Sequence, residues 1–347
     1  MSEAGKVRVA LVGCGYWGPK VIRAAASLPD VEVTALVDFR EDLRATLGRH
    51  YPLARSTATL GAALAGGPLD AVIVATNPAT HVEVAAEAID GGCHVMVEKP
   101  LALSAADCRD LGEKARAHGL VLMAGHTFRF SPLVNHVRSL VETGELGEIY
   151  SIDSQRLNLG RVRRDVDAIW NFAPHDISIL NYWLGQHPRS VHCHAYDYLQ
   201  PGIPDLAFLV LEYESTVAHV HISWLHPSKV RRMTIVGSSK MVVYDDVAGQ
   251  IVVHDAGIDR ERVDKSFPDF ETFGEFRLIQ RVGDMHIPRV QVAEPLALQC
   301  RHFVDCIRDG TEPVTDFEDA ARVVEVLEAA SASHANGGAL VAIPDLP

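Results

Sequence analysis

The sequence predicts an α/β protein of two domains: an N-terminal doubly wound parallel sheet and a C-terminal α+β domain with a mostly antiparallel sheet. Short β-branched runs alternate with helical patterns through the first 125 residues, and a glycine-rich turn follows the first run. After Gly147, closely spaced extended segments dominate. The 347 residues are 48% hydrophobic, enough to bury a core in each domain. We expect the domains to be residues 1–125 and 126–347.

The N-terminal domain is predicted from apolar strands that alternate with helices. The expected strands are Val7–Val12, Val31–Val37, Ala71–Ala75, His94–Val97 and Val121–Met123. The expected helices are Trp17–Leu28, Asp42–Gly48, Thr80–Ile89, Ala105–Ala117 and, past the boundary, Leu133–Glu142. Strands that are apolar throughout are typical of a parallel sheet covered by helices on both faces.

The second domain is predicted from strands joined by short turns. The expected strands are Ile149–Arg156, Val191–Tyr198, Leu206–Glu214, Thr216–Trp224, Arg232–Val236, Met241–Asp245 and Ile251–Asp255. The expected helices are Pro174–Leu184, Leu296–Asp309 and Phe317–Ala332, the last capped by Asp316. The tract Asp259–Val292 has no clear pattern. Because Leu206–Leu211 is apolar at every position, we expect cover on both faces, from Pro174–Leu184 and from a neighbouring subunit of a homodimer or homotetramer.

Composition excludes several classes of protein. The 32 Lys and Arg against 45 Asp and Glu give a net charge of −13, which disfavours nucleic acid and anionic membranes as partners. No membrane-length apolar run or N-terminal leader is found, so we expect a cytoplasmic protein. Six cysteines without a C-x-x-C pair suggest reduced, buried thiols. His192-Cys193-His194 has no second ligand pair of matching spacing, so no metal site is expected.

A dinucleotide-binding motif follows the first strand. The segment is Gly13-Cys14-Gly15-Tyr16-Trp17-Gly18, a G-x-G-x-x-G at the start of a helix. Its glycines permit a tight turn, close approach of a pyrophosphate and close helix–strand packing. Asp38 ends the second strand, where a carboxylate would bind ribose hydroxyls and repel a 2′-phosphate. This motif predicts a Rossmann domain and favours NAD over NADP, although the guanidinium of Arg40 could instead reach a 2′-phosphate.

Polar residues follow two further strands of the predicted parallel sheet. They are Thr76-Asn77-Pro78 with His81, and Glu98-Lys99-Pro100. Ligands of open α/β sheets bind at the carboxyl ends of the strands, so we expect these residues to contact the cofactor. Lys99 beside a cationic nicotinamide could act as a general base near neutral pH. The spacing alone allows equally that Lys99 is a solvated loop charge.

Together these motifs resemble the Gfo/Idh/MocA oxidoreductases, the family of glucose–fructose oxidoreductase and inositol dehydrogenase. The resemblance covers essentially the whole chain, and Glu98-Lys99-Pro100 is its most specific part. It implies a Rossmann domain, a mostly antiparallel C-terminal sheet, and NAD(P)-linked oxidation or reduction of a sugar or cyclitol. It also implies that Lys99 is the catalytic acid/base and that the Lys99–Pro100 bond is cis.

The family's second motif is present with one change. The segment Trp170-Asn171-Phe172-Ala173-Pro174-His175-Asp176 keeps the family's histidine as His175 but has Asn171 in place of an aspartate. The resemblance makes His175 and Asn171 catalytic candidates and Trp170 a substrate contact. Neutral Asn171 can hydrogen-bond a hydroxyl but cannot stabilise a cation by charge. Asp167 or Asp176 could supply the missing carboxylate, the reaction could run without one, or His175 could simply cap a helix.

The resemblance and local positive charge suggest further substrate contacts. Arg129 matches a family arginine near cofactor and substrate, while Arg156, Asn158, Arg163 and Arg164 cluster before Trp170. Such a cluster in an acidic protein could bind a diphosphate, or could pair with Asp165 and Asp167. These segments resemble the branch that oxidises or reduces nucleotide-linked sugars at C3, which makes that activity the first hypothesis. The alternatives are an inositol or free-sugar dehydrogenase, and a non-catalytic NAD-binding sensor.

Overall fold

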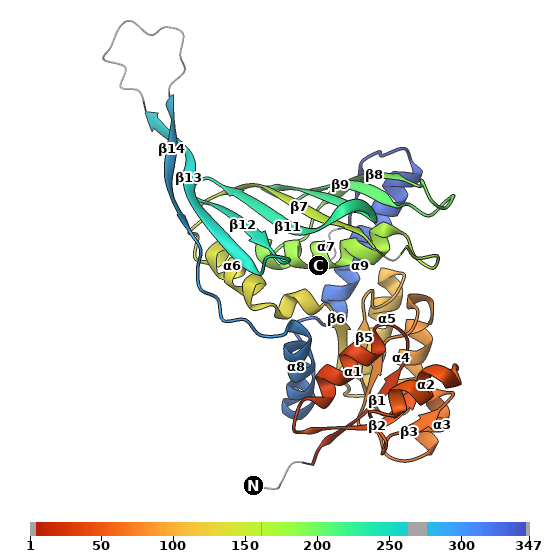
Figure 1. Ribbon diagram of the computed structural model, residues 1–347. Coiled ribbons are helices and arrows are strands. Elements are labelled where there is room, and N and C mark those ends of the chain that lie inside the picture. Colours follow the sequence, from red (N-terminus) through yellow and green to blue (C-terminus); the bar gives the residue numbers. More distant parts are fainter. Residues whose placement is uncertain (1–4, 161, 263–275, 345–347) are drawn as a thin grey trace, which may run out of the picture. The chain divides into compact units, whose positions relative to one another are not determined.

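The computed structural model describes residues 5–160, 162–262 and 276–344 (Figure 1). The chain divides into two compact units. Unit 1 comprises Met1–Ser131 and Ala293–Glu328, and unit 2 comprises Pro132–Val292 and Ala329–Pro347. The first crossing lies close to the predicted boundary at residue 125. The difference is that the C-terminal helices do not all belong to the second unit, since residues 293–328 return to the first.

Unit 1 is a doubly wound α/β fold. Its strands are β1 (Val7–Val12), β2 (Val31–Val37), β3 (Arg55–Thr57), β4 (Ala71–Val74), β5 (His94–Glu98) and β6 (Leu122–Gly125). They pair in parallel in the order β3-β2-β1-β4-β5-β6, which is the Rossmann order. The helices are α1 (Gly18–Ala26), α2 (Glu41–Gly48), α3 (Leu60–Ala65), α4 (His81–Asp90), α5 (Ala105–Ala117) and α8 (Pro295–Asp309), with short 3₁₀ turns η1 (Pro78–Thr80) and η2 (Thr127–Phe130). This confirms the predicted fold of the N-terminal region.

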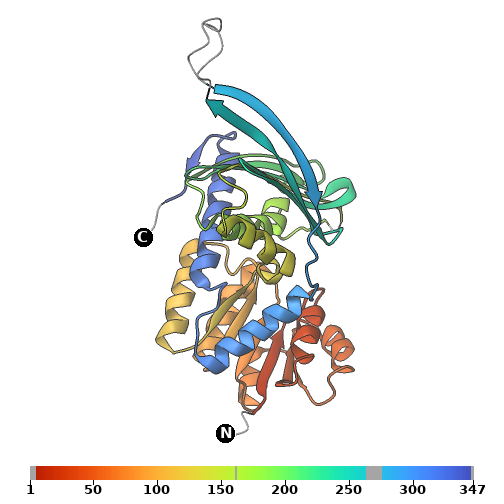
Figure 2. The same cartoon turned by 90° about the vertical axis from the view of Figure 1, so that its left-hand side faces the viewer.

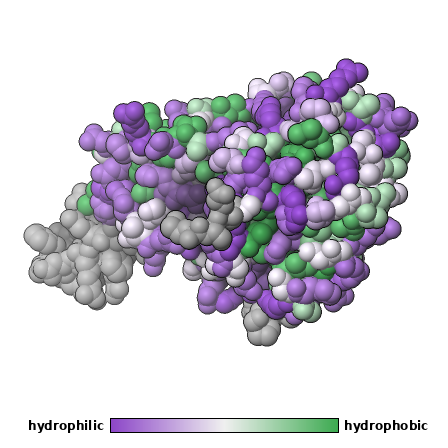
Figure 3. All heavy atoms as spheres, turned by 90° about the horizontal axis from the view of Figure 1, so that it is seen from below, coloured by the Kyte–Doolittle hydropathy of each residue, from purple (hydrophilic) through white to green (hydrophobic). Residues whose placement is uncertain are grey.

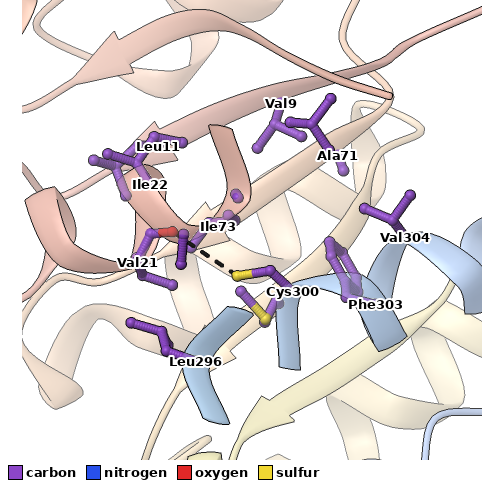
Figure 4. Close-up of a cluster of buried hydrophobic side chains, with 14 of the residues drawn as sticks. Val9, Leu11, Val21, Ile22, Ala71, Ile73, Leu296, Cys300, Phe303 and Val304 are labelled. Carbon is purple, nitrogen blue, oxygen red and sulfur yellow. Dashed lines mark hydrogen bonds between the residues drawn. The ribbon is translucent and has the colours of Figure 1, made fainter. Parts of the chain in front are cut away.

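The core of unit 1 includes a helix from the far end of the sequence. On α8, the side chains of Leu296, Cys300, Phe303 and Val304 are buried against Val9, Leu11 and Ile73 of the sheet and Val21 and Ile22 of α1 (Figure 4). The Cys300 thiol donates to the Val21 carbonyl at 3.8 Å. Figure 2 shows α8 in light blue beside the red and orange elements of this unit. Burial of the apolar face of α8 explains why it belongs to unit 1.

Unit 2 is built on a mostly antiparallel sheet, as predicted, and the described part of this sheet has nine strands, two more than the seven that were expected. Its strands are β7 (Ile149–Leu159), β8 (Ser190–Tyr196), β9 (Leu206–Glu212), β10 (Val217–Ser223), β11 (Leu225–Gly237), β12 (Met241–Asp245), β13 (Gln250–Arg262), β14 (Phe276–His286) and β15 (Val341–Ala342), in the order β14-β13-β12-β11-β7-β10-β9-β8-β15. The helices are α6 (Pro132–Glu142) and α7 (Ala168–Leu184), and α9 (Phe317–Ala335) begins in unit 1 and ends in unit 2. The consecutive strands β10 and β11 run in opposite directions, and β7 lies between them in the sheet. β7 is therefore antiparallel to β11 and parallel to β10. Part of the tract that had no predicted elements forms β14, and residues 263–275 lie outside the described part.

One face of this sheet is covered within the chain. On β9, Ala207, Leu209 and Leu211 are buried, and α7 packs against β7, β9 and β10 on that side. The alternate residues Leu206, Phe208 and Val210 are only half-buried. The expectation that Leu206–Leu211 is covered on both faces is therefore met on one face, and cover by a second subunit stays a prediction.

The described surface fits the composition. The face of the molecule seen in Figure 3 is largely hydrophilic, with hydrophobic residues in smaller groups between the polar ones. None of the helices in the described part of the chain has both the length and the apolar content of a membrane span. All six cysteines are buried thiols without a disulfide partner.

Candidate active site

The glycine loop between β1 and α1 has the three properties that a dinucleotide requires. Gly13 has a φ of +100°, and a Cβ atom there would lie 2.6 Å from the Ala75 carbonyl. A Cβ at Gly18 would lie 1.9 Å from the Gly13 oxygen. At Gly15, by contrast, a Cβ would meet no atom within 4 Å. Gly13 and Gly18 thus keep the turn tight, and Gly15 leaves open space above the backbone, where a pyrophosphate would approach.

The start of α1 suits an anion. Trp17 is the N-cap residue and its side chain makes no capping hydrogen bond, Pro19 occupies the first turn, and no acidic residue lies in that turn. The N–H groups and positive dipole of the helix N-terminus would therefore face a phosphate. Tyr16 in the loop is 70% exposed, and the ammonium of Lys20 lies 3.6 Å from the centre of its ring. This Lys20 charge beside the loop was not among the predicted contacts.

Asp38 is held in place by the backbone of the same region. Its carboxylate accepts from Cys14 N at 2.8 Å and from Arg40 N at 2.9 Å. The Arg40 guanidinium instead pairs with Asp42, at 2.6 Å between Nη2 and Oδ2. Arg40 is therefore engaged in an ion pair with a neighbouring carboxylate. Phe39 is 84% exposed beside Asp38, a residue that sequence reasoning missed because a lone aromatic after a strand carries no pattern.

The loop after β4 is tied to the loop that carries Lys99. The Asn77 side chain accepts from Ala79 N at 3.0 Å and caps η1, and Pro78 is buried. The His81 ring is buried, with Nδ1 2.8 Å from the Pro100 oxygen and Nε2 3.3 Å from the Thr76 oxygen. The side chain of His81, expected at the cofactor, thus joins two loops. It positions Pro100, the residue next to Lys99.

Lys99 follows β5 at the edge where the glycine loop also lies. The Lys99–Pro100 bond is cis, as the family resemblance implies, and Lys99 is half-buried. Its neighbour Glu98 is 9% exposed, so this residue, expected to contact the cofactor, directs its carboxyl into unit 1. Burial raises the pKa of Glu98 to about 7, while the indole of Trp17 and the charge and backbone N–H of Lys99 act in the opposite direction. Near neutral pH this carboxyl changes its charge.

Arg129 lies beside another buried titratable group. Its guanidinium pairs with Asp319 at 2.7 Å and donates to the Val314 oxygen at 3.2 Å, and its side chain is 10% exposed. Burial, with the charges of Arg129 and Lys99, lowers the pKa of His126 to about 3. His126 is therefore neutral at physiological pH, and Arg129 is bound to a carboxylate of its own unit.

In unit 2, α7 carries Trp170, Asn171 and His175 on one continuous helix. The side chain of Asp167 caps α7 by accepting from Trp170 N at 2.8 Å. The helix therefore begins six residues before the predicted start at Pro174, which lies inside it. Asn171 and His175 are four residues apart, so they share one face. Both are half-buried, and the Trp170 indole donates to Ser331 at 3.1 Å.

The next residue of α7 has a structural partner. Asp176 accepts from Arg156 of β7 at 2.6 and 3.1 Å and from Ser154 at 3.0 Å, and all three residues are buried. Burial acts to lower the pKa of Arg156, but the charge and hydrogen bonds of Asp176 raise it above its usual range. Arg156, predicted as a substrate contact, is thus held in an internal ion pair. Asp176 and the cap Asp167 are both used within unit 2, so neither is a spare carboxylate.

The other members of the arginine cluster lie near the surface. Arg163 forms a bidentate ion pair with Asp165, the alternative that the sequence left open, while Asn158 is half-buried and Arg164 is exposed. In the described part of the chain no group of His, Cys, Asp or Glu side chains could hold a metal ion. The His192 ring lies 3.0 Å from the Gly338 oxygen.

The residues of unit 1 fit a dinucleotide. The open space at Gly15 and the uncapped start of α1 suit a pyrophosphate. The fixed carboxylate of Asp38 suits the hydroxyls of a ribose. When bound, the nicotinamide would supply or accept the hydride. Phe39 offers an exposed ring beside Asp38 for the adenine.

Comparison with known proteins identifies both parts of the chain. The family model described as "Oxidoreductase family, NAD-binding Rossmann fold" matches residues 7–126, and the "GFO/IDH/MocA C-terminal domain" matches residues 134–243. A 4-carboxy-2-hydroxymuconate-6-semialdehyde dehydrogenase of Sphingobium is 26% identical over 93% of this chain and 98% of its own. The scyllo-inositol 2-dehydrogenase (NAD(+)) of Bacillus subtilis is 24% identical over 96% and 95%. The crystal structure of GenD2 from gentamicin A biosynthesis, in complex with NAD, shares the fold with a TM-score of 0.81 and 24% identity, covering 99% of this chain and 98% of its own.

Alanine substitutions should separate the roles of two loop glycines. We expect Gly15→Ala to weaken NADH binding at least tenfold without lowering the melting temperature, because its Cβ enters open space that the pyrophosphate needs. Gly13→Ala should instead lower the free energy of unfolding by about 2 kcal/mol or more, through its positive φ and the clash with Ala75. NADH fluorescence titration and thermal unfolding measure the two effects. Wild-type NADH affinity in Gly15→Ala would contradict the assignment of the loop.

Substitution of Asp176 should act on stability. Asp176→Asn weakens the ion pair of the buried Arg156 guanidinium, so we expect a loss of about 3–5 kcal/mol in the free energy of unfolding. The exposed Asp153→Asn on β7 is the matched control and should change it by less than about 1 kcal/mol. Urea denaturation gives both values. Should Asp176→Asn keep full stability and lose activity, Asp176 would belong to the chemistry instead.

Proposed function

Since this chain belongs to the Gfo/Idh/MocA family of oxidoreductases, we propose that it transfers hydride between NAD and a carbinol or ketone carbon of a sugar or cyclitol. The observation that carries the proposal is the position of Lys99. Lys99 lies two residues after Val97 of β5. Val97 pairs with Val74 of β4, and Val74 pairs with Val12 of β1, which precedes the glycine loop. An amine thus lies at the edge of the sheet where unit 1 suits a dinucleotide.

NAD is the preferred form of the cofactor in this proposal. The Asp38 carboxylate, fixed by two backbone N–H groups, would accept from the ribose hydroxyls and repel a 2′-phosphate. The pairing of Arg40 with Asp42 supports the preference, since it partly neutralises the nearby cation that would favour NADP. Gly15, Tyr16, Thr76 and Asn77 would complete the contacts.

Lys99 would exchange the proton of the substrate hydroxyl. As a neutral amine its Nζ accepts the hydroxyl proton when the alcohol is oxidised, and as an ammonium it returns the proton when the ketone is reduced. His81 supports this role by holding the carbonyl of Pro100, which fixes the loop. We further propose that His175, with Asn171 four residues before it, orients the substrate hydroxyls by hydrogen bonding.

The arginines distinguish two classes of substrate. A nucleotide-linked sugar carries a diphosphate, and its recognition would need cations not already neutralised. Arg156 is paired with Asp176 and Arg163 with Asp165, so we place a free sugar or cyclitol first. The exposed Arg164 keeps a nucleotide-linked sugar, oxidised or reduced at C3, as the second candidate.

We also propose that the protein acts in the cytoplasm as a homo-oligomer. Six buried thiols are typical of a reducing compartment. The half-buried side chains of Leu206, Phe208 and Val210 on the outer face of β9 would be covered by a second subunit through the C-terminal sheet.

Removal of the Lys99 amine should stop the reaction. With sugars and cyclitols that the wild-type enzyme accepts, we expect Lys99→Ala to lower kcat by about a hundredfold to ten-thousandfold, the usual contribution of a general acid/base. NADH should still bind, because the pyrophosphate and ribose contacts lie elsewhere. NADH absorbance follows turnover and fluorescence follows binding. Retained turnover in Lys99→Ala would overturn the mechanism, and NADH binding without consumption across the panel would favour a sensor.

Charge reversal of the surface arginines tests the substrate class. For a free sugar or cyclitol, we expect Arg163→Glu/Arg164→Glu to change KM by no more than about fivefold, because exposed ion pairs contribute at most about 1 kcal/mol. For a nucleotide-linked sugar the same variant should raise KM by more than about tenfold. Steady-state kinetics with both classes decides. A steep rise only with the nucleotide-linked substrate would reverse the order of the candidates.

A further inference from the structure

The Glu98 carboxyl is enclosed behind the residue proposed to move the proton. Glu98 is the last residue of β5 and pairs with Gly125 of β6. A Cβ at position 125 would lie 3.2 Å from the Glu98 carboxyl carbon and from Oε1. The Glu98 side chain therefore lies across Gly125, in space that exists because this glycine has no side chain. The strand pairing fixes the backbone from which this side chain extends.

The other groups around Glu98 are polar but uncharged. The indole of Trp17 acts on the carboxyl from α1, yet neither Trp17 Nε1 nor Glu98 Oε1 makes a hydrogen bond of normal geometry within the described chain. From α8, Cys300 lies close enough for the charge of Glu98 to act on its thiol, whose pKa burial raises to about 12. His126, after Gly125, is kept neutral by burial. The neighbours from α1, β6 and α8 thus bring no compensating charge.

Lys99 is the charged group that acts on this carboxyl. Among the described groups that influence Glu98, only Lys99 does so through a full charge. Arg129, which acts on His126, is already paired with Asp319. Electrostatic coupling is reciprocal, so an ionised Glu98 must favour the ammonium form of Lys99 by the same free energy with which Lys99 favours the carboxylate.

We propose that Glu98 is a positioning residue that sets the protonation state of Lys99 from behind the strand. The inference rests on the proposed role of Lys99 and adds the group that controls it. While Glu98 is a neutral acid, Lys99 loses its proton more readily. Once Glu98 is ionised, the ammonium of Lys99 is favoured. Alcohol oxidation needs the neutral amine, so ionised Glu98 restrains oxidation and supports the reverse reduction.

The substitution Glu98→Gln keeps the shape of the side chain and removes its charge. Without the carboxylate, Lys99 should lose its proton at lower pH, so the acidic limb of kcat/KM for oxidation should move down by about one pH unit. Glu113→Gln on α5, 63% exposed and paired with Arg116, is the matched control and should leave the limb unchanged. An unshifted limb in Glu98→Gln would overturn the proposal, since a merely structural role changes rate or stability without moving it.

A second measurement needs neither cofactor nor substrate. The neutral amine of Lys99 reacts with acetic anhydride, and peptide mass spectrometry gives its rate against pH in cofactor-free protein. In Glu98→Gln the rise of this rate should move to lower pH by about one unit, and in wild type it should flatten as Glu98 ionises near pH 7. Equal profiles in wild type and variant would overturn the coupling. Should no sugar be turned over while the labelling profile shifts, the proposed function fails and the Glu98–Lys99 coupling stands.

Stability gives an independent check that the carboxyl titrates in the fold. A carboxyl whose pKa is raised from 4.5 to about 7 binds its proton more tightly in the folded state. Relative to Glu98→Gln, wild type should therefore lose stability as pH rises from about 4.5 to about 7, and no further above. Thermal unfolding across this range measures the difference. A difference that does not vary with pH would place the titration of Glu98 outside this window and overturn the proposal.

Discussion

The register of three parallel strands is the constraint on which the candidate site of unit 1 depends. Val12, Val74 and Val97 are neighbours across β1, β4 and β5, so the loops that follow begin at the same edge of the sheet. One loop must pass so close to the Ala75 carbonyl that only glycine fits at position 13. The same register places Lys99 at this edge. A shift of one strand would separate the lysine from the glycine loop, and no change of side chain could restore the arrangement.

The two units enclose buried carboxyl groups in different ways, and the difference separates structure from chemistry. Asp176 in unit 2 has a guanidinium and a hydroxyl within hydrogen-bond distance, so its charge is compensated and fixed. Glu98 in unit 1 has no hydrogen bond of normal geometry to Oε1, and the effect of burial on its pKa is opposed first by the indole of Trp17 and then by the charge of Lys99. A compensated pair stabilises one arrangement, whereas a poorly compensated carboxyl responds to pH near neutrality.

Local patterns predicted the elements and motifs of unit 1 well, because each depends on neighbours in sequence. The helix Ala105–Ala117 has the predicted bounds, and its cap at Ser104 is a local contact. The short β3 and α3 were missed because neither is long enough to show periodicity. The membership of α8 in unit 1 could not be predicted, since its partners Val21 and Ile22 lie more than 270 residues away and Ile73 more than 220. The pairing of Arg156, predicted as a substrate contact, with Asp176 was missed because it depends on how β7 packs against α7, which no local pattern reveals.

The change at Asn171 makes the Glu98–Lys99 pair more important to the proposed chemistry. The family resemblance implies an aspartate at position 171, whose charge could help to stabilise a protonated catalytic group. Asn171 is neutral at every pH, and Asp167 and Asp176 are engaged as a helix cap and an ion-pair partner. Within unit 1, Glu98 is a carboxyl whose charge acts on Lys99. Glu98 is its neighbour in the chain and shares its electrostatic environment, so this influence does not depend on any residue of unit 2.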